Sequence, residues 1–220
     1  AYFQAYTNTY APIEELRDKY NQAIAEENVV ALSIATRPDC LGDDVLDLLE
    51  EMSKKVYLWV ELGLQTINDK TAENFNRGYK FEVFKEGIKK LQDRGIEVVV
   101  HSIFGLPGET KEDMLRTIDY IAHSGAQGIK FHLLHLMKNT KMAEQYYNGE
   151  FELLSEEDYI DLICQGISMI PEEMVVHRLT GDAPRATLIG PMWSLKKWEV
   201  LNAIDKALVD RDIWQGKNFK

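Results

Sequence analysis

Residues 96–123 read IEVVVHSIFGLPGETKEDMLRTIDYIAH, and this stretch decides the fold. The almost continuous apolar run Ile96–Phe104 predicts a strand that is buried on both faces. A turn with glycine and proline follows, and the pattern Thr110-x-x-Asp113 predicts the capped start of a helix that runs to about His123. A strand, a turn and a helix in this order form the repeating unit of α/β proteins with parallel sheets.

The same alternation extends in both directions along the chain. Further strands are expected at Ala1–Tyr6, Val29–Ala35, Val56–Leu64, Ile129–Met137 and Met174–Arg178. Further helices are expected from Pro12, over Asp43–Lys54, over Phe81–Arg94, from Ser155 to Pro171, and over about Leu195–Val209. The first turn, Thr7–Pro12, lacks the pattern G-x-G-x-x-G, so we expect a complete or partial barrel rather than a dinucleotide-binding sheet.

Net charge, the length of the apolar runs and the cysteine count each argue against certain classes of protein. The 220 residues carry 25 Lys and Arg against 36 Asp and Glu, and the net charge of −11 argues against unaided binding to nucleic acid. No apolar run approaches the ~20 residues that span a bilayer, and no charged-then-apolar leader opens the chain, so we expect a cytoplasmic protein without a membrane segment. The two cysteines, Cys40 and Cys164, form neither a disulfide framework nor a CxxC pair.

Polar side chains gather where the expected strands end, which is where α/β barrels place their sites. Thr7 and Asn8 follow the first strand, although such residues also form ordinary turns. In the third strand, alternation places Glu61 and Gln65 on one side. Burying a glutamate is costly, so Glu61 indicates a functional site unless an arginine or lysine pairs with it.

The fourth expected strand also ends in polar and glycine-rich sequence. His101 lies in this strand, and Gly105 allows the backbone to approach a ligand closely. His132 and His135 lie three residues apart in the fifth expected strand. This spacing predicts opposite faces, and we therefore reject a metal site built from the two histidines.

The joint order of six motifs resembles the radical SAM superfamily. They are QAYTNTYAP (4–12), ATRPDC (35–40), VELGLQTIND (60–69), NRGY (76–79), HSIFGLPGET (101–110) and HRLTGDAPR (177–185). The likeness is greatest to the YhcC/YtqA-like branch, which is related to the radical domain of the Elongator catalytic subunit. It implies a partial (β/α)6 TIM-like barrel that lacks its first strand and cluster loop and has a C-terminal helical extension. Residues 1–175 would form the barrel, and residues 176–220 an extension packed on the same domain.

The resemblance also implies the chemistry. A [4Fe–4S] cluster would cleave S-adenosylmethionine to a 5′-deoxyadenosyl radical, which abstracts hydrogen from a substrate. Cofactor contacts are expected from Thr7, Asn8, Glu61, Gln65, Arg77, His101, Ile103 and Gly105. Thr7 to Thr9 replace the usual Gly-Gly-Glu, and His101 stands where related enzymes have an acidic ribose-binding residue.

The cluster-binding pattern Cys-x3-Cys-x2-Cys is absent from the chain. Three thiolates hold such a cluster, so its ligands are expected outside this chain, and these residues alone are expected to be inactive. No metal ligand and no catalytic residue is assigned within the 220 residues.

Kinship to Elongator suggests a modified tRNA base as the substrate, and the reaction would need an external electron donor. Three alternatives remain open. One is an oxidoreductase that resembles the radical SAM coproporphyrinogen oxidases. Another is a non-radical barrel enzyme with His101, Glu61 and Arg77 as acid, base and anion clamp. The last is a binding module without activity.

Overall fold

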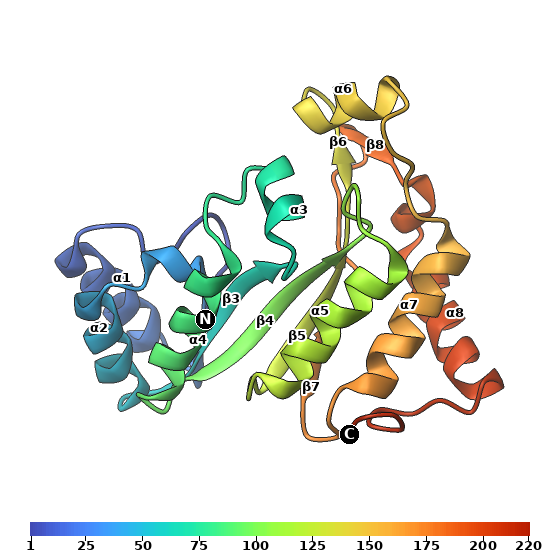
Figure 1. Ribbon diagram of the computed structural model, residues 1–220. Helices are drawn as coiled ribbons and strands as arrows, with labels where there is room; N and C mark the ends of the chain where they lie inside the picture. Colours follow the sequence, from blue (N-terminus) through green and yellow to red (C-terminus); the bar gives the residue numbers. More distant parts are fainter. The chain divides into compact units, whose positions relative to one another are not determined.

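A six-stranded sheet of parallel strands organises the chain, in the order β1-β2-β3-β4-β5-β7 (Figure 1). The computed structural model describes residues 1–220. The strands are β1 Tyr2–Phe3, β2 Ala31–Thr36, β3 Tyr57–Gln65, β4 Glu97–Phe104, β5 Gly128–Leu133 and β7 Val175–Arg178. Two short strands, β6 Leu136–Met137 and β8 Leu188–Gly190, form a separate antiparallel pair. The predicted α/β class and partial TIM-like barrel are confirmed.

Helices alternate with the strands along the chain. They are α1 Ile13–Ala25, α2 Asp43–Ser53, α3 Asp69–Asn74, α4 Phe81–Gln92, α5 Lys111–His123, α6 Lys141–Tyr147, α7 Glu156–Met169 and α8 Lys197–Asp210. Two single-turn 3-10 helices, η1 Pro38–Cys40 and η2 Met192–Leu195, lie between them. No helix is both long and apolar enough to cross a membrane.

The chain divides into two compact units. The first unit comprises residues 1–64, 79–101 and 126–128. The second comprises residues 65–78, 102–125 and 129–220.

In the first unit, side chains on both faces of the parallel strands are buried. Ile34 on β2 pairs with Val60 on β3, and both are 0% exposed, while Ser33, whose side chain points to the opposite face, is 2% exposed. Burial on both faces explains why these strands read as continuous apolar runs. Helix α4 packs against η1 at Gly87, where a Cβ would lie 3.0 Å from Cβ of Pro38. Glycine at this position therefore allows the helix to come close.

In the second unit, an aromatic cluster forms the core. The ring centroids of Phe104 and Phe131 are 5.8 Å apart, and those of Phe104 and Tyr159 are 6.2 Å apart. The Tyr159 hydroxyl donates to the carbonyl oxygen of Leu179 at 2.8 Å. Burial raises the pKa of Tyr159, so the hydroxyl keeps its proton and remains a donor.

The predicted fifth strand, Ile129–Met137, is wrong as a single element. The chain leaves the main sheet after Leu133, and residues 136–137 pair instead with β8. The apolar pattern continues through this break because β6 contributes the buried Leu136. A run of apolar residues does not reveal which strand each half will pair with.

Substituting Val60 by alanine tests the importance of the buried sheet. Val60 is 0% exposed, so Val60→Ala is expected to lower the free energy of unfolding by about 2 kcal/mol, through lost burial and an incompletely filled cavity. The matched control is Val209→Ala on α8, where the side chain is 80% exposed and the change should stay within about 0.5 kcal/mol. Urea denaturation of both variants measures the difference, and equal losses would contradict this account of the core.

Candidate functional site

The first unit holds a buried carboxylate, Glu61 on β3, that is only 3% exposed. Its oxygens accept hydrogen bonds from the Tyr2 hydroxyl at 2.7 Å and the Ser33 hydroxyl at 3.0 Å. Nε2 of His101 on β4 lies 2.9 Å from Glu61 Oε2. Four strands therefore contribute to one polar cluster, in which Glu61 and His101, both predicted as cofactor contacts, are in direct contact. Donors around a buried carboxylate offset its desolvation.

The turn after β1 is held by its own side chains. The Asn8 amide donates to the carbonyl oxygens of Phe3 and Ala35, at 2.9 Å in both cases. This amide therefore connects β1 to β2, which is a structural role. The Thr7 hydroxyl, in contrast, makes no hydrogen bond within the chain. Of these two predicted residues, Thr7 has the unused polar group.

In the second unit, the backbone at the end of β3 adopts an uncommon conformation. Gln65 has a φ of 62°, in the left-handed region that residues other than glycine rarely occupy. Such backbone strain is concentrated at ligand-binding and catalytic sites.

Arg77 fixes the chain segment that follows Gln65. Its guanidinium donates to the carbonyl oxygen of Thr66 at 2.6 Å and to Asp69 Oδ1 at 3.1 Å. The residue is 4% exposed and its bond to Thr66 is buried, whereas the Asp69 side chain is 42% exposed. The planar guanidinium can make two such contacts in fixed directions, whereas a lysine could not.

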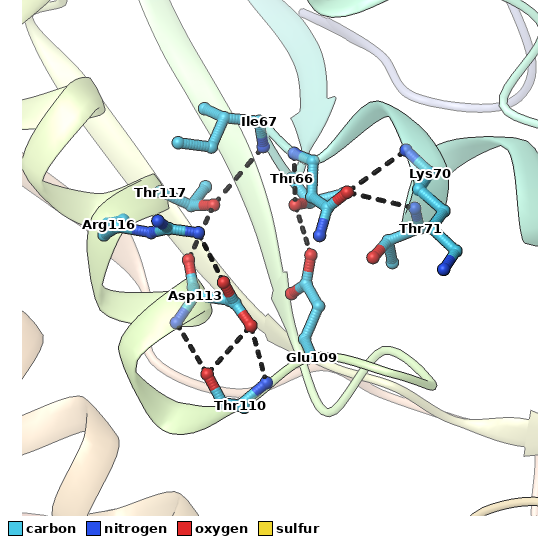
Figure 2. Close-up of polar contacts among 10 residues, drawn as sticks. Thr66, Ile67, Lys70, Thr71, Glu109, Thr110, Asp113, Arg116 and Thr117 are labelled. Carbon is cyan, nitrogen blue, oxygen red and sulfur yellow. Dashed lines mark hydrogen bonds and ion pairs between the residues drawn. The ribbon is translucent and has the colours of Figure 1, made fainter.

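Glu109, in the turn after β4, also contacts this segment. Figure 2 shows the Thr66 hydroxyl donating to its carboxyl group, while the same hydroxyl oxygen accepts from the backbone nitrogen of Asn68 at 2.9 Å. The backbone nitrogen of Ile67 donates to Thr117 Oγ1 on α5 at 3.3 Å. The side chains of Glu109, in the turn, and Thr117, on α5, thus both bind the residues that follow β3.

Burial is the main cause of a raised pKa at Glu109, and the hydrogen bond from Thr66 opposes it. The helix behind the turn begins with the predicted capping box. The Thr110 hydroxyl accepts from the backbone nitrogen of Asp113 at 3.2 Å, and the Asp113 carboxylate accepts from the backbone nitrogen of Thr110 at 3.0 Å.

Gly105, predicted to admit a ligand, makes room for another side chain. Its φ is 87°, and a Cβ there would lie 3.2 Å from the Leu154 side chain. Both the backbone conformation and the close packing therefore require glycine. Ile103, two residues earlier on β4, is half-buried.

The two histidines that were expected on opposite faces converge. A Cβ on Gly181 would lie 2.9 Å from Cε1 of His135 and 3.8 Å from Nδ1 of His132. The prediction of opposite faces is wrong because β5 ends at Leu133 and the chain turns before His135. Burial lowers the pKa of His135, which favours a neutral imidazole.

The residues of this chain do not fit a [4Fe–4S] cluster. Cys40 is half-buried in the first unit, and Cys164 is buried on α7 in the second. Burial raises the pKa of both thiols, which opposes the thiolate form that binds iron. No group of three or more His, Cys, Asp or Glu side chains is placed to hold one metal ion.

Sequence reasoning missed a pocket of about 360 Å³ in the second unit. Its walls come from the end of α3, the segment around β6, and α6. Both helices are too short for a hydrophobic period to reveal them. Their caps were the available signal, since Asn68 accepts from the backbone nitrogens of Lys70 and Thr71 and Thr140 accepts from that of Ala143.

Family comparison covers most of the chain. Residues 2–121 match the Radical SAM superfamily, and residues 126–210 match the Radical SAM C-terminal domain. The chain is 53% identical over 220 residues to the uncharacterized protein YtqA of Bacillus subtilis, which covers 100% of this chain and 68% of the relative. It is 29% identical over 178 residues to the tRNA uridine(34) acetyltransferase of Methanocaldococcus jannaschii, covering 80% of this chain and 32% of that protein.

A solved structure shares the fold. The archaeal Methanocaldococcus infernus Elp3 with an N-terminal deletion superimposes with a TM-score of 0.82 at 20% sequence identity. The match covers 97% of this chain but 54% of that one, so the chain spans about half of the solved, N-terminally truncated chain. At this identity, the likeness concerns the fold alone.

Glu109→Gln is expected to change how stability depends on pH. Because burial raises the folded-state pKa above its ordinary value of 4.5, unfolding of the wild-type protein releases a proton once the pH exceeds about 4.5. The wild-type free energy of unfolding should therefore fall, relative to the variant, as the pH rises from 4.5 through the folded-state pKa. Above that pKa the difference should remain constant.

Urea denaturation between pH 4 and pH 8 measures this difference. Glu112→Gln, an exposed carboxylate in the first turn of the same helix, is the control. A stability difference between Glu109→Gln and wild type that does not change with pH would contradict the assigned burial effect.

Proposed function

Because the chain belongs to the radical SAM superfamily, in the branch of YtqA- and YhcC-like proteins, we propose that the whole protein binds S-adenosylmethionine and cleaves it at a [4Fe–4S] cluster. The product would be a 5′-deoxyadenosyl radical that abstracts hydrogen from a substrate, with an external electron donor. The cluster ligands are assigned to residues outside this chain, since Cys40 and Cys164 do not fit that role. The 220 residues alone are therefore expected to be inactive.

The conformation of Gln65 carries the proposal. A strained, non-glycine backbone at the end of a parallel strand is typical of a ligand contact, and barrel enzymes bind ligands at this end of their strands. Arg77 holds the next residue along the chain, through the carbonyl oxygen of Thr66. We therefore propose that the Gln65 side chain contacts S-adenosylmethionine and that Arg77 holds it in position.

The other proposed cofactor-binding residues differ in how free they are to bind. Thr7 has an unused hydroxyl, whereas the Asn8 amide is occupied by two carbonyl oxygens. Glu61 and His101 already contact each other. Ile103 and Gly105 complete the proposed set in the turn region after β4, where Gly105 would contribute backbone atoms only.

A tRNA base is the proposed substrate class. The support is the relative named tRNA uridine(34) acetyltransferase, which is 29% identical to this chain. The net charge of −11 means that most phosphate contacts would come from outside these residues. We also propose that residues 1–175 form the barrel and residues 176–220 an extension of it, whose helix α8 packs against α7.

One contact favours a second candidate function. His101 and Glu61 form a pair in which a buried carboxylate orients an imidazole, and such pairs act in general acid–base catalysis. A non-radical barrel enzyme could use this pair. Unlike the leading proposal, it requires neither a cluster nor S-adenosylmethionine.

Anaerobic reconstitution of the full-length protein tests the function. With iron and sulfide, the protein is expected to develop the broad absorbance of a [4Fe–4S] cluster. With dithionite and S-adenosylmethionine, it is expected to form 5′-deoxyadenosine. Failure of the full-length protein to bind a cluster would overturn the radical proposal and favour the His101–Glu61 chemistry.

Gln65→Ala is expected to weaken binding of S-adenosylmethionine by about 1–3 kcal/mol, because it leaves a buried polar group of the ligand without a partner. Calorimetry on the full-length reconstituted protein measures the change. Gln22→Ala, an exposed glutamine on α1, is the control and should bind as wild type does. Unchanged affinity in Gln65→Ala would remove Gln65 from the cofactor site.

A further inference from the structure

The pocket formed by α3, the β6 segment and α6 has the size of a small-ligand site. Its volume of about 360 Å³ lies at the lower end of the range of about 300–1,000 Å³ for such sites. This size suits one heterocyclic ring system with its sugar and disfavours a tetrapyrrole. All the residues around it belong to the second unit, in which Figure 1 shows α6 next to β6.

The walls offer an apolar surface to a flat ring. Phe75, Met137 and Met142 line the pocket, and each is half-buried. Aromatic rings stack on bases, and methionine side chains adapt to the faces of rings. Proteins that recognise single-stranded RNA bind unstacked bases between surfaces of this kind.

The pocket also presents three amide side chains that nothing else in the chain uses. Asn74, Asn76 and Gln145 line the pocket, and none of their side chains makes a hydrogen bond or ion pair within the protein. Each amide both donates and accepts, as the edge of a nucleobase does. The amide side chains can therefore form hydrogen bonds with the edge of a base while both partners remain uncharged.

The lining of the pocket, unlike the chain as a whole, carries no acidic residue. No Asp or Glu lines the pocket, while Lys141 does and forms no ion pair. Glu73 and Glu144 adjoin lining residues along the chain and are exposed, so Lys141 is the one charged group that the lining itself offers to a phosphate.

Local contacts hold two of the walls, at the end of α3 and at the start of α6. Asn76 occupies the left-handed region with a φ of 57°, and the next residue is the buried Arg77. Thr140 caps α6 through the backbone nitrogen of Ala143 at 3.1 Å. Fixed walls reduce the entropy lost when a ligand is bound.

We propose that this pocket binds the target nucleobase of the RNA substrate. The amides of Asn74, Asn76 and Gln145 read the edge of the base, Phe75 and the two methionines pack against its faces, and Lys141 contacts a neighbouring phosphate. This inference rests on the proposed function, since it assigns the substrate of that enzyme to a site.

The test measures binding of a fluorescent anticodon stem–loop RNA to the full-length protein by anisotropy. One RNA carries uridine at position 34, and the second carries an abasic residue there. Asn74→Ala and Gln145→Ala are each expected to weaken binding of the uridine RNA about tenfold, which corresponds to the loss of a net hydrogen bond. Neither variant should change binding of the abasic RNA, which also shows that the variant is folded.

Asn202→Ala is the matched control, because Asn202 is an exposed asparagine on α8 whose side chain also makes no hydrogen bond. It should bind both RNAs as wild type does. Equal losses for both RNAs, or no loss in Asn74→Ala and Gln145→Ala, would overturn the proposal.

Equilibrium dialysis of S-adenosylmethionine with the same variants separates two sources of a nucleobase. Unchanged cofactor binding together with weaker uridine binding supports an RNA base in the pocket. Weaker cofactor binding would assign the pocket to the cofactor's adenine and overturn the RNA proposal. If the wild-type protein binds both RNAs equally yet forms 5′-deoxyadenosine, this inference fails while the proposed function stands.

Discussion

The buried guanidinium of Arg77 fixes the part of the second unit on which both proposals depend. It donates to the carbonyl oxygen of Thr66 and to Asp69, so the chain between β3 and its own position is closed into a loop. On one side of this loop lies Gln65, and on the other lie the residues around Asn76 that form a pocket wall. A single planar cation therefore orients both a proposed cofactor contact and a proposed substrate contact.

The acidic composition and an RNA substrate are compatible if recognition of the base is separated from attraction of the backbone. The described pocket supplies shape, amides and one lysine, which select a base but contribute little long-range attraction. Long-range attraction depends on the number of phosphates that a protein neutralises, and that number can be set by a different part of the full-length protein. A site can thus be specific without a basic chain around it.

Much of the fold could be predicted because each buried strand is an apolar run followed by an amphipathic helix. The capping box at Thr110 and Asp113 was read correctly for the same reason, since it depends on neighbouring residues only. The break after Leu133 could not be read, because the choice between two pairing partners depends on β8, about fifty residues further along the chain. Short helices such as α6 contain too few residues to show a period.

The site was predicted less completely than the fold. Glu61 and His101 were both predicted as cofactor contacts, but their direct contact and the hydroxyls of Tyr2 and Ser33 that complete the cluster carry no sequence signal. The glycine at position 105 was expected to make room for a ligand, and the structure shows a leucine in that space. Local sequence patterns do not encode contacts between residues that are far apart in the chain, and the candidate site is built from such contacts.

At Gln65, whose backbone is in the left-handed region, selection for stability and selection for ligand binding favour different residues. Glycine would adopt this conformation without the strain, of order 1 kcal/mol or more, that a residue with a side chain carries there. Selection for thermal stability alone would therefore favour glycine at position 65, at the expense of the amide. If glutamine is retained at position 65 as the sequence evolves, ligand binding is under stronger selection there than stability is.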